Sequence, residues 1–150
     1  MNPDNLEQDY TTRQLKPDFV AGHSLGEYSA HVAAGTIAFA DALGIVKRRG
    51  RYMQEAVPIG DGAMAVILGL DASSVKQACD ESSNGEVVAP ANLNAPQQIV
   101  IAGTREAVHR AGEVAKRMGA KRVISLRVSA PFHCALMQPV ADRLAPELRG

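Results

Sequence analysis

Apolar and polar residues follow one pattern along the chain before Gly62 and another pattern from Gly62 onward. In the first part, a short apolar run at residues 18–21 predicts a strand, and apolar positions at helical spacing predict a helix over residues 25–34. Gly35 predicts a turn, and a second helical pattern begins near Ala38. Residues 1–17 are polar and have no clear period, so we expect a polar lead-in there.

From Gly62 the pattern predicts a strand, a helix, two strands, a helix and a strand. Asp71 and Thr104 suit the N-cap positions of the two helices, and Gly119 suits the end of the second. This βαββαβ order is that of the split-βαβ or ferredoxin-like unit. The expected strands cover residues 63–70, 86–92, 97–102 and 121–126, the helices cover 71–81 and 104–118, a turn falls at 94–96, and a last helix covers 134–148.

The composition of the 150 residues limits the kinds of partner and compartment. Lys and Arg number 16 and Asp and Glu number 16, which argues against nucleic acid or an anionic membrane as the main partner. The two cysteines, Cys79 and Cys134, lack metal-site spacing, so we expect a reducing compartment and no disulfide framework. No apolar stretch is long enough to span a membrane and the N-terminus lacks a secretory pattern, so a cytoplasmic protein is expected.

The most informative motif is the sequence Gly-His-Ser-Leu-Gly at residues 22–26, which lies between the predicted strand and the predicted helix. A serine on such a turn fits a nucleophile elbow, in which the hydroxyl stands clear of the sheet. Glycines at the first and last positions leave room for a strained backbone. The first N–H groups of the following helix would stabilise a developing oxyanion. The alternative is that Ser24 is an ordinary helix N-cap.

On the second helix, one arginine stands apart from its neighbours. At about 100° per residue, Lys47, Arg48 and Arg51 fall on a solvated face. Arg49 lies on the flank of the apolar stripe, where losing its hydration is costly unless an anion pairs with it. Two partners fit: a protein carboxylate, or a substrate carboxylate held by the guanidinium fork. The apolar stripe consists of Phe39, Ala42, Leu43, Val46, Gly50 and Met53.

A serine nucleophile needs a base, and histidine titrates in the right range. His133 is the best candidate because it ends a strand-like segment just before a helix start, where sites assemble in open α/β folds. His23 adjoins the serine and is expected to point away from it, His31 lies on the helix after the elbow, and His109 is expected to be solvated. Cys134 adjoins His133, and adjacent side chains seldom face each other, so a cysteine nucleophile is disfavoured.

Several short motifs follow one another in a recognisable order. They are GHSLGEYSA at residues 22–30, Arg49-Gly50, Met53-Gln54, GAMA at 62–65, NLN at 92–94 and FHC at 132–134. Together they resemble the malonyl-CoA:acyl carrier protein transacylases, whose relatives include acyltransferase domains of polyketide synthases. The resemblance covers about residues 19–150. It implies an α/β fold class, namely a partial α/β-hydrolase-like acyltransferase domain (18–61 and 127–150) with an inserted ferredoxin-like subdomain (62–126).

The resemblance also implies roles for single residues. Ser24 would attack the thioester of malonyl-CoA, His133 would be its base, and the Leu25 N–H would donate to the oxyanion. Arg49 would hold the free malonyl carboxylate, and Met53 and Phe132 would line the acyl pocket, with the bulk of Phe132 favouring malonyl. The acceptor would be the phosphopantetheine thiol of acyl carrier protein, in fatty acid biosynthesis, and the family needs no metal or other cofactor.

Departures from the family and three other functions remain open. No Gly-Gln-Gly-rich loop precedes Phe19, and the chain stops at Gly150, so the isolated chain is expected to be weak or inactive. One alternative is a serine thioesterase or hydrolase, for which the candidate acids are Asp61, Asp71 and Asp80. The others are a non-catalytic carrier-protein-binding module and an acyltransferase piece of a polyketide synthase. The sequence does not determine the oligomeric state.

Overall fold

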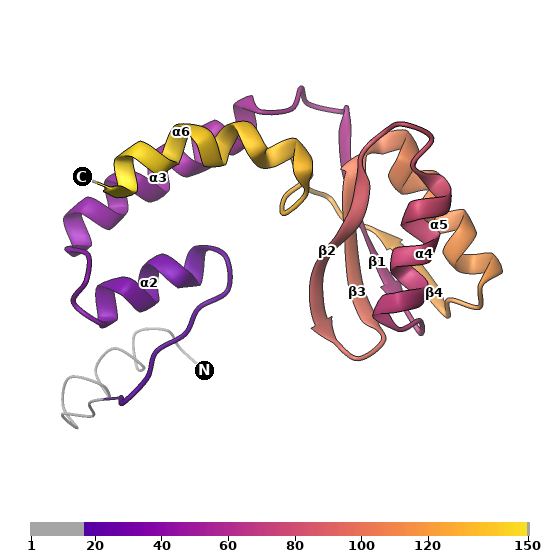
Figure 1. The fold of residues 1–150 in the computed structure, drawn as a ribbon, viewed down its shortest axis with the longest axis horizontal. Helices are drawn as coiled ribbons and strands as arrows, with labels where there is room; N and C mark the ends of the chain where they lie inside the picture. Colours follow the sequence, from indigo (N-terminus) through magenta and orange to yellow (C-terminus); the bar gives the residue numbers. More distant parts are fainter. Residues whose placement is uncertain (1–16, 150) are drawn as a thin grey trace. The chain divides into compact units, whose positions relative to one another are not determined.

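The computed structural model describes residues 17–149, so most of the predicted lead-in at 1–17 lies outside the described residues. The chain divides into two compact units, residues 1–46 and residues 47–150, and each unit is described by itself (Figure 1). Helix α2 (Leu25–Ala33) belongs to the first unit. Helix α3 (Phe39–Glu55) begins in the first unit and ends in the second. The chain is thus an α/β protein whose strands, among the described residues, all lie in the second unit.

The first unit confirms the predicted helix and corrects the predicted strand. Helix α2 ends one residue before its predicted limit, and Gly35 has a φ of +73°, as a turn there requires. Residues 18–21 form no strand, and the side chain of Phe19 is 93% exposed. A strand exists only through ladder hydrogen bonds to a neighbour, and nothing within residues 17–149 pairs with this apolar run. The pattern was therefore typical of a strand, but local sequence does not supply the partner.

The second unit contains a four-stranded antiparallel sheet covered by two helices. The predicted βαββαβ order is confirmed, as β1 (Gly62–Leu68), α4 (Ala72–Ser82), β2 (Val88–Ala95), β3 (Gln98–Thr104), α5 (Arg105–Arg117) and β4 (Arg122–Ser125). The strand order across the sheet is β2-β3-β1-β4, and β1 pairs with β3 in register from Gly62 opposite Thr104 to Leu68 opposite Gln98. Figure 1 shows α4 and α5 on the same face of this sheet.

Alternate residues of the strands enter two different apolar clusters, as the pleat of a sheet requires. On the helix-covered face, Ile67, Ile99 and Ile101 are almost fully buried together with Val75 of α4 and with the small residues of α5. The opposite face buries Met64, Val100 and Ala102, and there Phe132 and Cys134 pack against it. The segment that follows β4 is thereby held on the second face of the sheet.

Turn and cap residues of this unit agree with the prediction in part. The Asp71 carboxylate accepts from the Ser74 N–H at 2.7 Å and so caps α4 as predicted. Thr104 is the N-cap residue of α5, but its hydroxyl donates to Glu86 and makes no capping bond. The turn predicted at 94–96 falls at residues 96–97, because strand pairing continues to Ala95 opposite Gln98. Pro96 fixes the first turn position and Gln97 takes a φ of +61° at the second.

The last predicted helix starts later than expected. A 3₁₀ turn (η1, Ala135–Met137) comes first, and α6 runs over Gln138–Arg149. Helix α6 is tied to the C-terminal half of α3, since Arg48 pairs with Glu147 and Arg143 pairs with Glu55. No helix among residues 17–149 combines the length and the apolar character needed to cross a lipid bilayer.

The buried face of α3 differs from the predicted stripe. Ala42 and Met53 are buried as expected, whereas Phe39 and Leu43 are 66% and 55% exposed. Tyr52 is buried instead, with its hydroxyl donating to the Glu147 carboxylate. Arg48, predicted on a solvated face, is half-buried in its ion pair with the same carboxylate. The prediction failed here because α6 supplies an acidic partner from about a hundred residues away in the sequence.

Candidate functional site

Ser24 has an unusual backbone conformation for a residue with a side chain. Its φ is 56° and its ψ is −110°, outside the helical, extended and left-handed helical regions. It directly precedes α2, yet its side chain makes no capping hydrogen bond. Such strain persists only where the surroundings enforce it, and it gathers at active sites. This backbone geometry fits a nucleophile elbow better than it fits an ordinary capping serine.

The two glycines of the motif have different roles. A Cβ atom built on Gly22 would lie 1.9 Å from both the carbonyl carbon and the oxygen of Gly26, a distance that no side chain tolerates. A Cβ atom on Gly26 would meet nothing within 4 Å. The turn is closed by the Gly26 N–H donating to the His23 carbonyl at 2.9 Å. Gly22 is therefore the glycine that the elbow geometry demands.

The first turn of α2 provides the expected electrostatic environment beside the serine. Leu25 is the first residue of the helix, where an N–H has no acceptor within the helix itself. Two residues further along, the Glu27 N–H donates back to the Ser24 carbonyl at 3.2 Å. The positive end of the helix dipole thus lies at the serine, where it favours a developing negative charge.

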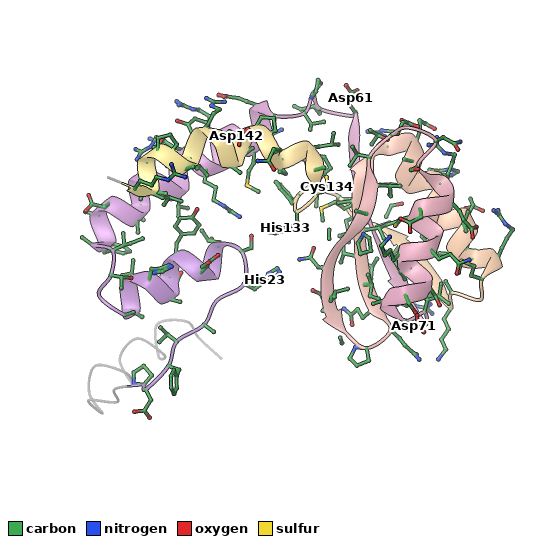
Figure 2. All side chains as sticks on the ribbon, in the orientation of Figure 1. His23, Asp61, Asp71, His133, Cys134 and Asp142 are labelled. Atoms are coloured by element: carbon green, nitrogen blue, oxygen red, sulfur yellow. The ribbon has the colours of Figure 1, made fainter. Side chains whose placement is uncertain are left out.

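His133 lies in the loop between β4 and α6, where Figure 2 labels it beside Cys134. Its φ is 60°, and its side chain is exposed. The strand-like segment predicted before it is a series of bends and turns, since only the Leu126 N–H continues the ladder, to the Met64 carbonyl. The backbone at His133 is nevertheless fixed by the contacts of the residues on either side.

The neighbours of His133 hold this loop firmly. Ala130 and Pro131 are almost fully buried, and the Pro131 ring lies so close to Gly62 that a Cβ atom there would approach within 2.4 Å. The Cys134 thiol donates to the Pro131 carbonyl at 3.1 Å. The Gln54 side chain of α3 donates to the Ser129 carbonyl at 3.3 Å. These contacts from the sheet and from α3 fix the backbone on both sides of the histidine.

The predicted substrate-binding residues lie on two elements of the second unit. Arg49 is half-buried on α3, and Met53, one turn further along, is 8% exposed. The carboxylate that α6 supplies, Glu147, pairs with Arg48. Phe132 packs against the second face of the sheet, next to Met64, Val100 and Ala102. The arginine and the phenylalanine are thus presented from a helix and from a sheet-anchored loop respectively.

Other candidate bases and nucleophiles have local structural explanations. His31 Nδ1 is 2.9 Å from the Thr36 hydroxyl, which itself donates to the His31 carbonyl, so this histidine helps to close the end of α2. His109 is exposed on α5. Burial raises the pKa of the Cys134 thiol, so the reactive thiolate is disfavoured. Burial also raises the pKa of Cys79 to about 12.

Two of the three acids considered for a hydrolase triad are engaged elsewhere. The Asp71 carboxylate accepts from the Ser73 hydroxyl and the Ser74 N–H, which lowers its pKa and keeps it at the start of α4 (Figure 2). Asp80 pairs with Lys76 one turn away on the same helix. The Asp61 carbonyl accepts from the Arg105 N–H just before β1. Two of the three carboxylates therefore serve α4 locally.

The predicted site residues are shared between the two units. Ser24 and Leu25 lie in the first unit, and Arg49, Met53, Phe132 and His133 lie in the second. A hollow of about 550 Å³ between α5 and strands β1 and β4 contains none of these residues. Among residues 17–149, no three His, Cys, Asp or Glu side chains are grouped so that they could hold a metal ion.

Sequence comparison identifies the family. Residues 7–149 match the family described as acyl transferase domain. The chain belongs to this acyl transferase family. Over 132 residues it is 61% identical to a malonyl CoA-acyl carrier protein transacylase of Escherichia coli K12, and over 131 residues it is 57% identical to the protein of the same name from Bacillus subtilis.

Solved structures agree with this assignment. The solved structure of a malonyl-transacylase in complex with its type II PKS acyl-carrier protein matches this chain with a TM-score of 0.92 and 53% sequence identity. An acyl carrier protein S-malonyltransferase from Vibrio cholerae matches with a TM-score of 0.91 and 51% identity. Each match covers 95% of this chain and 47% of the solved chain. Likewise, the Escherichia coli match covers 88% of this chain but 43% of that relative, so the chain spans less than half the length of the relatives it matches.

Proposed function

We propose that this chain belongs to an enzyme that transfers a malonyl group from malonyl-CoA to the phosphopantetheine thiol of an acyl carrier protein, in fatty acid biosynthesis. The observation that carries the proposal is the strained serine before α2, held by the close approach of Gly22 to the Gly26 backbone. The names of the relatives supply the substrate and the partner. On this basis Ser24 is the nucleophile, and malonyl transfer through a serine ester requires no metal or other cofactor.

In the first half-reaction, the Ser24 hydroxyl attacks the thioester carbonyl of malonyl-CoA. His133 accepts the hydroxyl proton as the new C–O bond forms, and the Leu25 N–H donates to the oxyanion. The C–S bond then breaks, His133 returns the proton to the departing CoA thiol, and a malonyl-serine ester remains. In the second half-reaction the phosphopantetheine thiol gives its proton to His133 and attacks that ester. The C–O bond to Ser24 breaks, His133 returns the proton to the serine oxygen, and the malonyl thioester of the carrier protein leaves, which gives ping-pong kinetics.

Selection of the acyl group would rest on the second unit. Arg49 binds the free malonyl carboxylate through its planar guanidinium, a group that suits two-point recognition of carboxylates. Met53 and Phe132 border the acyl group, and the bulk of Phe132 leaves little room for a branched acyl chain. A neutral acyl group such as acetyl lacks the carboxylate and loses this contact.

The domain organisation supports the same proposal. Residues 62–126 would be the ferredoxin-like subdomain of the enzyme, because their βαββαβ order and β2-β3-β1-β4 sheet are those of that unit. Residues 18–61 and 127–150 would belong to the larger, α/β-hydrolase-like subdomain. Balanced charge and two free cysteines fit a cytoplasmic enzyme.

The first test is brief mixing of the chain with malonyl-CoA, followed by intact-protein mass spectrometry, with Ser24→Ala as the control. We expect one malonyl adduct on the parent and none on the control.

A chimera makes the test decisive if the isolated chain is silent. In it, this chain replaces the matching residues of the Escherichia coli relative. Malonyl transfer to a carrier protein by the chimera, lost on Ser24→Ala, supports the proposal. Release of free malonate without transfer would support the hydrolase alternative instead, and an inactive, folded chimera would refute the transferase assignment.

A further inference from the structure

Five side chains connect α3 and α6 in one continuous group, which we call the α3–α6 clasp: Arg48, Tyr52 and Glu55 of α3 and Arg143 and Glu147 of α6. The Glu147 carboxylate accepts from Arg48 through one oxygen and from the Tyr52 hydroxyl through the other, the latter at 2.9 Å. Arg143 donates to Glu55 at 2.8 Å and lies 3.7 Å from the centre of the Tyr52 ring. Each carboxylate therefore has a cation from the other helix, and Tyr52 contacts both residues of α6.

The spacing of the clasp residues places them on one side of each helix. Arg48, Tyr52 and Glu55 follow one another at four and three residues, and Arg143 and Glu147 are four residues apart. At about 100° per residue, Arg49 lies next to this face and not on it, and Met53 lies farther round the helix. The rotation of α3 about its own axis, once fixed by the clasp, thus also fixes the direction of Arg49.

Apolar contacts alone define such a rotation poorly, because they have no preferred direction. Hydrogen bonds to both oxygens of a carboxylate are directional and define it better. Tyr52 is buried to 9% exposure with its hydroxyl bonded, so it cannot turn without losing that bond. The hydrogen bond from Arg48 is the main cause that lowers the pKa of the Glu147 carboxyl.

We propose that the α3–α6 clasp is a positioning device for acyl selection: it sets the rotation of α3 so that Arg49 faces the acyl carboxylate, without itself touching substrate. The inference rests on the proposed function, in which Arg49 binds malonyl. Glu147 and Tyr52 are therefore specificity-determining residues, and their loss reduces the reaction with charged acyl groups more than the reaction with neutral ones.

The test compares initial rates of acyl-enzyme formation from malonyl-CoA and from acetyl-CoA. For Glu147→Gln we expect the malonyl rate to fall about tenfold, with little change in the acetyl rate. This is less than the roughly 10²-fold loss that a displacement of a substrate-binding group by about 1 Å can cause. Tyr52→Phe, which loses one hydroxyl, should show the same effect at about threefold. Glu113→Gln is the matched control, since Glu113 pairs with Lys116 on the surface of α5, and it should leave the ratio of the two rates unchanged.

A second readout separates positioning from folding. In an Arg49→Ala background, Glu147→Gln should have no further effect on the ratio of malonyl to acetyl rates, because the clasp acts through Arg49. If both rates fall together in Glu147→Gln, or neither changes, the clasp is merely structural and the inference is wrong. If neither the parent nor the chimera forms any acyl-enzyme, the proposed function itself fails and this inference with it.

Discussion

Residues 62–126 and the elbow at residues 22–27 hold their backbones in opposite ways. In the former, strands pair in regular register and Ile67, Ile99 and Ile101 are almost fully buried between sheet and helices. At the elbow, Ser24 has a strained φ and ψ, and its geometry depends on a glycine without room for a Cβ atom. The first region thus gains stability from regular pairing and burial, whereas the second has a strained backbone that costs stability.

Positive φ values also distinguish the proposed site residues from residues in ordinary turns. Among residues 17–149, the non-glycine residues with positive φ are Ser24, Asn84, Gln97 and His133. Asn84 follows α4 and Gln97 forms the β2–β3 turn, positions where such conformations are ordinary. The other two are the residues proposed as nucleophile and base, one in each unit. The strain at these two positions supports the proposed site.

The largest expected effect is the loss of stability when a fully buried side chain of the sheet is truncated. Ile67→Ala removes a side chain with 0% exposure and should lower the free energy of unfolding by about 2–5 kcal/mol. Urea unfolding followed by circular dichroism measures this. Leu93→Ala is the control, because Leu93 is 68% exposed, and it should stay within about 0.5 kcal/mol of the parent. Equal losses for both variants would mean that the buried cluster is misassigned.

The elbow should fail through its backbone. Gly22→Ala places a methyl group against the Gly26 carbonyl and should slow malonyl-adduct formation by at least about 10²-fold, because the serine is displaced. Gly26→Ala meets no atom within 4 Å and is the matched control. Adduct formation at the parent rate in Gly22→Ala would show that the close approach is not needed for chemistry.

Removing the backbone strain at the ordinary turn between β2 and β3 should raise the stability slightly, whereas Ile67→Ala lowers it. A left-handed conformation costs a residue with a side chain about 1–2 kcal/mol, and glycine avoids that cost but loses more chain entropy. Gln97→Gly should therefore raise the free energy of unfolding by about 0.5 kcal/mol, with no change in malonyl-adduct formation. Gln98→Gly, in strand β3, should lower the stability instead. A loss of adduct formation in Gln97→Gly would connect this turn to the site unexpectedly.

The smallest effect concerns acid. Arg110 donates to Glu86, and the Thr104 hydroxyl donates to it as well, which together hold the Glu86 pKa below its usual value. A carboxyl whose folded pKa is lowered adds stability above its unfolded pKa of about 4.3, and that stability is lost as pH falls through the folded pKa. Melting temperatures of the parent and Glu86→Gln should thus differ at pH 7 and converge below about pH 4. A constant difference across this range would contradict the assignment.

Local pattern predicted the sheet region well and the surroundings of the site less well. Period-two alternation and the caps at Asp71 and Gly119 locate each element of residues 62–126, because such signals act within a few residues. The Gly-x-Ser-x-Gly motif likewise predicted the turn before α2, where the close approach of Gly22 to the Gly26 backbone requires a glycine. The turn could therefore be predicted, although the φ and ψ of Ser24 could not.

Features that depend on distant partners were not predictable. The apolar run at 18–21 forms no strand, because no neighbour pairs with it within the described residues. The α3–α6 clasp joins residues near 50 to residues near 145, and its trace in the sequence is limited to the three- and four-residue spacing of its members within each helix. Arg48 was consequently placed on a solvated face, although it pairs with Glu147.

The central claim is that strain at Ser24 marks the nucleophile, and mapping the malonyl group tests it most directly. The chain, or the chimera if the chain alone reacts too slowly, is mixed briefly with malonyl-CoA, digested with protease and sequenced by tandem mass spectrometry. We predict that the malonyl group is on Ser24 and is absent from the Cys134 peptide. A malonyl group on Cys134 or another residue, with Ser24 unmodified, would contradict the account.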